Sequence, residues 1–164
     1  MEEGLRLAVV PITMPEGVNI ILGQSHFIKT VEDLYEALVS ASPHLKFGLA
    51  FAESSGPCLI RYDGNDEQLA KLASELLLQL ACGHAFLILL REGYPINVLN
   101  RIKEVVEVVT LYCATANPVQ VIVAETPQGR GILGIIDGYR SRGIEGPEHK
   151  EERHRLLRKL GYKR

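Results

Sequence analysis

The stretch His84-Ala85-Phe86-Leu87-Ile88-Leu89-Leu90-Arg91 decides the fold, because it holds one of the longest apolar runs of the chain. Its core lacks the alternation of polar and apolar residues that marks a strand with one wet face. We therefore expect a central strand that is covered on both faces. The pattern before it predicts a helix that begins at Asn65 or Asp66, and Gly83 is expected to end that helix in the left-handed conformation.

Outward from this strand, the hydrophobic pattern predicts further strands at 5–12, 18–22, 46–52, 57–62, 108–113, 119–124 and 131–136. Other helices are expected from Thr30, which can act as the N-cap, from Pro95, and over residues 147–160. Hairpin-like pairs of strands alternate with helices. We therefore expect an α/β (α+β) fold, with a mixed parallel/antiparallel sheet packed by helices in a single domain of residues 1–164. The polar, glycine-rich residues 140–147 are expected to form a mobile connection.

Composition narrows the classes of function. The chain has 164 residues, 46% of them hydrophobic, and a net charge of -2, which predicts a real core and no basic face for a nucleic acid. Its apolar runs are too short to cross a membrane. The start, Met1-Glu2-Glu3-Gly4, is acidic where a signal peptide is basic, so we expect a cytoplasmic protein.

Neither cysteines nor histidines predict a metal site. Cys58, Cys82 and Cys113 show no Cys-x-x-Cys spacing and are expected to be small buried apolar residues. No two histidines have ligand spacing on one element together with a carboxylate.

The segment Gly129-Arg130-Gly131-Ile132-Leu133-Gly134 matches the pattern G-x-G-x-x-G. A dinucleotide fingerprint needs a helix after the glycines, and here a strand is expected, so that function is not predicted. The phosphate-binding loop G-x-x-x-x-G-K-[ST] is absent from the sequence. The glycines would still let a ligand approach the backbone, and Arg130 could meet an anion. A tight hairpin with a solvated Arg130 is the alternative.

Two further loops carry candidate chemistry. Glu53-Ser54-Ser55-Gly56 offers a carboxylate, hydroxyls and open amides that suit a phosphate or a sugar, or it is an ordinary turn. His84 follows the expected helix end. Its neutral imidazole could act as a base or as a nucleophile toward phosphorus, or it could simply interact with the helix C-terminus.

The remaining candidates lie toward the C-terminus. Asn97 and Asn100 share one helical face and could bind a base or a ribose, or could be solvated. Thr115 and Asn117, in Ala114-Thr115-Ala116-Asn117-Pro118, lie in a ligand loop or a bend. Asp137, before Gly138, is either part of a hairpin turn or a carboxylate at a strand end.

Taken together, these segments resemble one family, the adenosine-specific kinases, which are small proteins found mainly in archaea and thermophilic bacteria. The resemblance covers nearly the whole chain. The segments that carry it are Phe51-Ala52-Glu53-Ser54-Ser55-Gly56, Gly83-His84-Ala85-Phe86, Pro95-Ile96-Asn97-Val98-Leu99-Asn100, Ala114-Thr115-Ala116-Asn117-Pro118, and Gly129-Arg130-Gly131-Ile132-Leu133-Gly134 with Asp137-Gly138.

The resemblance implies binding of adenosine or AMP in preference to ADP and ATP, a phosphorylated histidine, and a homotrimer. His84 is matched to the phosphorylated histidine, and Asp137 or Glu53 is expected to accept a proton or to orient the imidazole. No cofactor is expected, except Mg²⁺ if the phosphoryl donor is a nucleoside triphosphate. The expected ligand-binding residues are Glu53, Ser54, Ser55, Gly56, Asn97, Asn100, Thr115, Asn117, Gly129, Arg130 and Gly131.

Two alternatives stay open from the sequence. One is a nucleoside or AMP sensor without turnover, which the missing phosphate-binding loop favours. The other is a structural protein whose polar loops form the contact between subunits.

Overall fold

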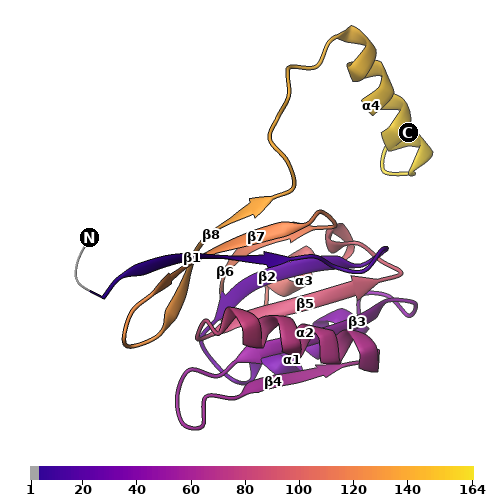
Figure 1. Cartoon of the computed structure of the whole chain (residues 1–164). Coiled ribbons are helices and arrows are strands. Elements are labelled where there is room, and N and C mark those ends of the chain that lie inside the picture. The colour runs from indigo at the N-terminus through magenta and orange to yellow at the C-terminus, as the bar shows by residue number, and fades with distance from the viewer. Residues whose placement is uncertain (1–3) are drawn as a thin grey trace.

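The computed structural model describes residues 4–164, so the acidic start Met1-Glu2-Glu3 lies outside it (Figure 1). In chain order its elements are β1 (Arg6–Ile12), β2 (Asn19–Ser25), α1 (Thr30–Val39), β3 (Lys46–Ala52), β4 (Ile60–Gly64), α2 (Glu67–Leu80), β5 (Ala85–Arg91), the short 3-10 helix η1 (Pro95–Asn97), α3 (Leu99–Lys103), β6 (Val108–Thr115), β7 (Val119–Glu125), β8 (Arg130–Asp137) and α4 (Pro147–Lys159).

The strands form two sheets, one of five strands in the order β4-β3-β5-β2-β6 and one of three in the order β1-β7-β8. Every pairing between the described strands is antiparallel, so the expected parallel component is wrong. The physical reason lies in the crossovers. Helix α1 joins β2 to β3, α2 joins β4 to β5, and η1 with α3 joins β5 to β6. Each crossover skips one strand, so an antiparallel strand always separates the two strands that run in the same direction.

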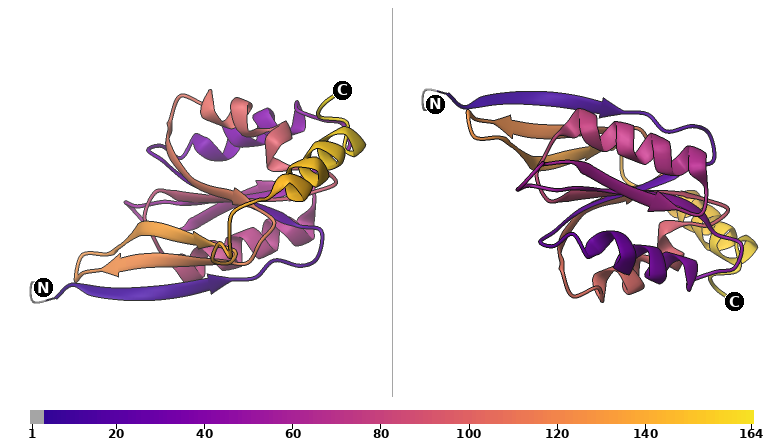
Figure 2. Two further views of the ribbon diagram at one scale, coloured as in Figure 1. Left: turned by 90° about the horizontal axis from the view of Figure 1, so that it is seen from above. Right: turned by 90° about the horizontal axis from the view of Figure 1, so that it is seen from below.

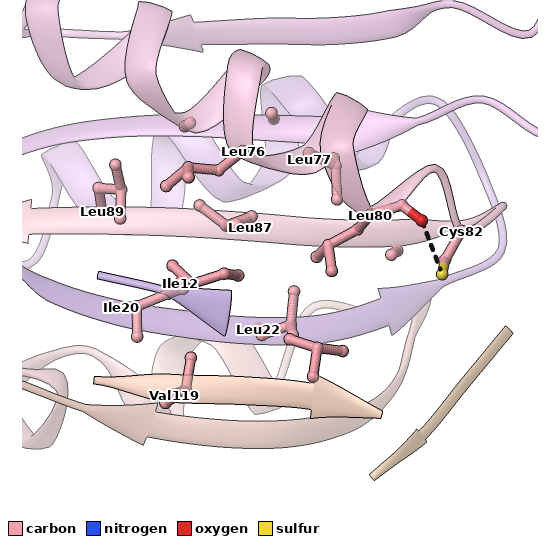
Figure 3. Close-up of a cluster of buried hydrophobic side chains, with 14 of the residues drawn as sticks. Ile12, Ile20, Leu22, Leu76, Leu77, Leu80, Cys82, Leu87, Leu89 and Val119 are labelled. Atoms are coloured by element: carbon pink, nitrogen blue, oxygen red, sulfur yellow. Dashed lines mark hydrogen bonds between the residues drawn. The ribbon is translucent and has the colours of Figure 1, made fainter. Parts of the chain in front are cut away.

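Helices and the small sheet cover both faces of the large sheet, as Figure 2 shows. Helices α1 and α3 pack on one face, while α2 and the three-stranded sheet pack on the other. Strand β5 is the middle strand and is buried on both sides, as predicted: Leu87 and Leu89 point to the α2 side, and Phe86 and Ile88 to the α1 side. Figure 3 shows side chains of α2 lying over Leu87 and Leu89.

Helix ends follow local chemistry that the sequence shows only in part. Asp66 caps α2, because its carboxylate accepts a hydrogen bond from the Leu69 amide at 3.0 Å. The left-handed residue after α2 is Ala81, with φ 50°, and not Gly83. Thr30 lies inside α1 and does not cap it. Its hydroxyl lies 2.7 Å from that of Ser25 and also reaches the carbonyl of Phe27.

Two other expectations concern the second half of the chain. The helix predicted from Pro95 is divided into η1 and α3. The predicted C-terminal helix is confirmed as α4, which Figure 1 shows standing away from the sheets. Residues 138–146 lead to it without regular secondary structure. Across residues 4–164, every helix is too short or too polar to cross a lipid bilayer.

Candidate functional site

A groove of about 630 Å³ opens between the β3–β4 loop, the end of α2 and the β7–β8 hairpin. We call it the glycine groove. Its volume lies in the range of small-molecule sites. Its polar and glycine lining residues are Glu53, Ser54, Cys58, Cys82, Gly83, Thr126, Gln128, Gly129, Arg130 and Gly131. The groove therefore brings together the predicted loop at 53–56, through its first two residues, and the predicted glycine hairpin.

A smaller hollow of about 130 Å³ adjoins the groove, because both are lined by Cys82, Gly83 and Gly131. It runs toward the space between the two sheets, where the hydroxyl of Tyr112 donates to Oε1 of Gln24 at 3.2 Å. The wall of the site thus continues into a polar pair from β2 and β6.

Close packing fixes the wall at Gly83. A Cβ atom at Gly83 would lie 2.7 Å from the Cβ of Ser54, closer than real Cβ atoms come. Gly83 has an ordinary negative φ, so the glycine is required by this contact and not by a left-handed backbone. The absence of a side chain here lets the β3–β4 loop and the α2–β5 loop form one continuous surface.

Glu53 is held as a carboxylate within the loop that it begins. Its Oε2 accepts the Leu59 amide at 2.9 Å, and its Oε1 lies 3.1 Å from the guanidinium of Arg61. The Leu59 N–H first, and Arg61 second, lower the pKa of Glu53 from its ordinary value. A carboxylate with a lowered pKa is a weak base, so Glu53 is suited to shaping the loop rather than to accepting a proton.

Arg130 lies across the groove with its side chain 22% exposed, so the alternative of a fully solvated arginine is wrong. Its Nη1 donates to the carbonyl of Gln79 in the last turn of α2 at 3.3 Å, and its Nε lies 3.7 Å from the Glu125 carboxylate. Within residues 4–164 that Nε has no hydrogen-bond partner. This Nε is buried and faces Glu125, so an anion in the groove would meet the remaining N–H groups of the guanidinium.

His84 has an unusual backbone. Its φ is +64°, and its N–H donates to the Ala52 carbonyl at 2.8 Å, while its carbonyl accepts the Ser25 amide at 3.0 Å. Left-handed residues other than glycine are uncommon and cost free energy. The imidazole stacks on Phe51 with the ring centroids 5.8 Å apart and an interplanar angle of 20°. The neighbouring strands therefore hold this histidine in one place.

The imidazole lies beside the groove and not in its lining. Phe51, on which it stacks, belongs to the core on the α1 side, whereas Gly83 lines the groove on the α2 side. The alternative for His84 was a contact with the helix C-terminus; in the structure Arg130 makes that contact, because its guanidinium donates to the Gln79 carbonyl.

The other predicted residues lie at the opposite end of the two sheets, at or beyond the C-terminal ends of β5, β6 and β8. The seven residues of β5 separate the two groups by about 20 Å. Within one chain, the expected ligand-binding residues are therefore divided between two ends of the fold. The residues at this far end are Asn97, Asn100, Thr115, Asn117 and Asp137.

Most of these far residues already hold local turns. Oδ1 of Asn97 accepts the Tyr94 amide at 2.9 Å. The hydroxyl of Thr115 accepts the Asn117 amide at 3.0 Å, and Nδ2 of Asn117 donates to Asp137 at 3.3 Å. The contacts of Thr115, Asn117 and Asp137 fit their bend and turn alternatives. Asn97 holds a turn where a ligand or solvent was expected, and Asn100 is exposed.

A second hollow of about 620 Å³ lies at this far end, between η1, the end of β6 and the last residues of the chain. Its lining is mainly apolar, with Tyr94, Ile96, Leu99, Leu160 and Tyr162 around it. It lacks a charged side chain and a glycine-rich backbone, so the glycine groove is the better candidate for a phosphate-bearing ligand.

Sequence reasoning missed several lining residues. Thr126 and Gln128 could have been found from their position beside Gly129. Cys58 was expected to be buried but is exposed at the groove, whereas Cys82 is buried as expected. Ser55 and Gly56 belong to the loop but do not line the groove. Within the described residues, no group of three or more His, Cys, Asp or Glu side chains is placed to hold a metal ion.

A model of one protein family, described as adenosine specific kinase, matches residues 10–163. The chain belongs to this family. The crystal structure of the PH1918 protein from Pyrococcus horikoshii OT3 is similar over 98% of this chain and 99% of that one, with 48% identical residues and a TM-score of 0.93. None of the curated proteins searched matches the chain. Family membership confirms the resemblance inferred from the loop motifs.

Proposed function

We propose that the chain binds adenosine or AMP in the glycine groove and transfers a phosphoryl group through His84. The observation that carries this proposal is the backbone of His84, a left-handed residue pinned at both its N–H and its carbonyl one residue from the groove wall. Backbone strain of this kind clusters at functional sites.

The groove suits a nucleoside or its monophosphate. Gly129 and Gly131 leave their backbone open to a ligand, since no atom lies within 4 Å of a Cβ built at either position. Arg130 supplies positive charge, and Ser54, Thr126 and Gln128 supply hydrogen-bonding groups for a sugar or a base. These groups converge from two loops, the β3–β4 loop and the β7–β8 hairpin.

The phosphoryl transfer takes two steps. A nitrogen lone pair of the neutral imidazole attacks the donor's phosphorus, a P–N bond forms, and the P–O bond to the donor's leaving group breaks. The 5′-hydroxyl of adenosine then attacks the same phosphorus and the P–N bond breaks. The proton of that hydroxyl goes to the imidazole nitrogen that is released. Glu53 has a lowered pKa and Asp137 of the same chain lies at the far end, so neither is needed as the base.

The setting of the reaction completes the proposal. We propose a cytoplasmic homotrimer, with Mg²⁺ entering only with a nucleoside triphosphate donor. Exposed apolar side chains on the small sheet, among them Leu7, Val9 and Leu133, support self-association.

A sensor that binds AMP without turnover is the second candidate. It is favoured by one observation, namely that the imidazole of His84 stacks on Phe51 outside the groove lining. The two candidate functions differ in the role of His84: the transferase needs its imidazole for phosphoryl transfer, whereas in the sensor His84 has only a structural role.

Intact-protein mass spectrometry after incubation with a panel of phosphoryl donors, ATP among them, tests the proposal. His84→Asn is the diagnostic variant, because Asn tolerates the left-handed backbone but cannot form a phosphoramidate. His26→Asn, at an exposed histidine of the neighbouring loop, is the matched control. Phosphate on the wild type and on the control, but not on His84→Asn, supports the transferase.

The opposite result is equally clear. If wild-type protein takes up no phosphate from any donor and adenosine never becomes labelled, the transferase is refuted. Thermal stabilisation by AMP that is equal in wild type and His84→Asn would then assign the protein to the sensors. Stabilisation by neither adenosine nor AMP at millimolar concentration would remove both candidates.

A further inference from the structure

The outer face of the three-stranded sheet is apolar where a solvated sheet face is usually polar. In β1, Ala8 and Val10 pack toward the core while the alternate residues Leu7 and Val9 point outward. The register of the sheet places Ile122 of β7 opposite Val9. The outward apolar side chains with their exposed fractions are Leu7 55%, Val9 54%, Leu133 63% and Ile136 48%. A contiguous apolar face of this kind marks an interaction surface.

The C-terminal arm, residues 138–164, has apolar side chains that do not pack into the hydrophobic core of their own chain. Every residue of α4 is exposed or half-buried. Leu156 and Leu160 lie four residues apart on one side of the helix and are 53% and 58% exposed, and Ile144 in the linker is 98% exposed. A helix of 13 residues is marginal in water by itself. In its own chain the arm begins with the Gly138 amide, which donates to the Pro118 carbonyl at 3.0 Å, and its end borders the far hollow through Leu160 and Tyr162.

Charge favours another copy of this chain as the partner of the arm. Residues 147–164 hold seven Lys or Arg and three Glu side chains, which gives a formal charge of +4. The whole chain has -2, so residues 1–146 carry -6. A basic arm is attracted to an acidic body. If two copies of the chain exchange their arms, each acidic body binds the basic arm of its neighbour.

The connection makes such an exchange possible. The arm follows β8, an edge strand of the small sheet itself. Its nine linker residues, 138–146, can span about 30 Å when extended, which is enough to reach a neighbouring molecule. Figure 1 shows the linker leaving β8 away from the body, with α4 at its end. Repeated around a symmetric assembly, the same contact would place every arm on the next sheet.

We infer that the arm docks on the outer face of the β1-β7-β8 sheet of a second copy of the chain. The inference deepens the proposed self-association and rests on it, but it does not depend on phosphoryl transfer. Leu156, Leu160 and Ile144 supply the apolar contacts, and the basic side chains around them face the acidic body.

Light scattering after size-exclusion chromatography measures the mass of the assembly. Val9→Glu on the sheet and the pair Leu156→Glu and Leu160→Glu on the arm are expected to lower that mass. Val106→Glu is the matched control, because Val106 is 83% exposed but lies after α3, away from both surfaces. Circular dichroism and the thermal midpoint show whether each variant keeps its fold.

A photo-crosslink identifies the partner directly. p-Benzoylphenylalanine at position 156 is introduced into a mixture of ¹⁴N- and ¹⁵N-labelled full chains. Crosslinked peptides that join the two isotopes and map to residues 5–12 or 130–137 support the inference. Crosslinks within one isotope only, or to peptides of other elements, overturn it.

The outcomes separate this inference from the assembly itself. A monomeric wild type would refute both. An assembly whose mass is unchanged by the arm substitutions would refute the arm contact alone and leave self-association standing.

Discussion

The close approach of Gly83 to Ser54 gives the sharpest prediction about the groove. In Gly83→Ala, the new Cβ would lie 2.7 Å from the Cβ of Ser54, and ordinary contact between carbons needs about 3.5–4.0 Å. Ser54 must therefore move by about 1 Å. The atom in conflict is a Cβ close to the backbone, so no side-chain rotation relieves the contact, and the loop at 53–56 must shift with it.

The expected cost follows from general values for overpacking. Such insertions cost about 1–3 kcal/mol, and an alanine recovers about 0.4–1 kcal/mol by restricting the unfolded chain. The middle of these two ranges gives a net loss of about 1–2 kcal/mol. For a chain of this length that is a fall in Tm of about 2–8 °C. The shifted Ser54 also narrows the groove, so AMP should stabilise the variant less than the wild type.

Matched controls come from the other glycines of the groove. At Gly129 and Gly131 a Cβ would meet nothing within 4 Å and φ is not in the left-handed region, so alanine there should not destabilise the fold and should add about 0.4–1 kcal/mol of stability. Ser54→Gly removes the conflicting Cβ. The double variant Ser54→Gly with Gly83→Ala should regain most of the stability that Gly83→Ala loses.

Differential scanning fluorimetry with and without AMP, followed by urea unfolding, measures all five variants. The reasoning is refuted if Gly83→Ala is as stable as wild type, or if removing the Ser54 Cβ brings no recovery. A stable Gly83→Ala that binds AMP normally would also remove Ser54 from the groove wall.

Three further predictions concern charge and turns, each read by urea unfolding. The Leu59 amide and Arg61 lower the pKa of Glu53, so the ionised Glu53 side chain stabilises the fold above the unfolded pKa near 4.5. This contribution to stability is lost as pH falls through the folded pKa. Glu53→Gln should therefore be less stable than wild type at pH 7, and the difference in stability should close in acid. Burial first, and Asp33 second, raise the pKa of Glu107, whose side chain is 1% exposed, so wild-type stability should fall as pH rises from about 4.5 through the raised value. Glu107→Gln can still donate to Asp33 and should lack that fall; a parallel pH profile would contradict this. Asn97→Ala removes the acceptor of the Tyr94 amide and should cost about 0.5–1.5 kcal/mol, against no measurable loss for Asn100→Ala, whose side chain is exposed.

The strands could be predicted from the sequence, but their directions could not. An unbroken apolar run such as that of β5 has only one stable place, which is inside a sheet covered on both faces. The same pattern says nothing about which strand lies next to it. A crossover helix fits between neighbouring parallel strands and equally between strands with one antiparallel strand in the gap, and this chain uses the second arrangement throughout.

The sequence singled out Gly83 as a glycine that the fold needs, but the structural reason predicted for it was wrong. A glycine near a helix end predicts a left-handed stop. In this structure Ala81 adopts that conformation, and the glycine is needed for a contact with Ser54, which is 29 residues earlier in the chain. Local sequence cannot distinguish a backbone requirement from a distant steric one, because both select the residue without a side chain.

The division of the candidate residues follows from the direction of β5. His84 precedes this strand and Asn97 follows it, so the strand itself carries them to opposite ends of the sheet. The hairpin at 129–131 joins the His84 end because β8 starts there beside Gly83, and Asp137 reaches the other end because β8 runs back. A nucleoside monophosphate is shorter than the roughly 20 Å between the ends. The far asparagines can therefore contact a ligand in the glycine groove only from a second copy of the chain. Asn100→Ala would weaken AMP binding in an assembled protein if they do so, and would leave it unchanged if their turns are their whole role.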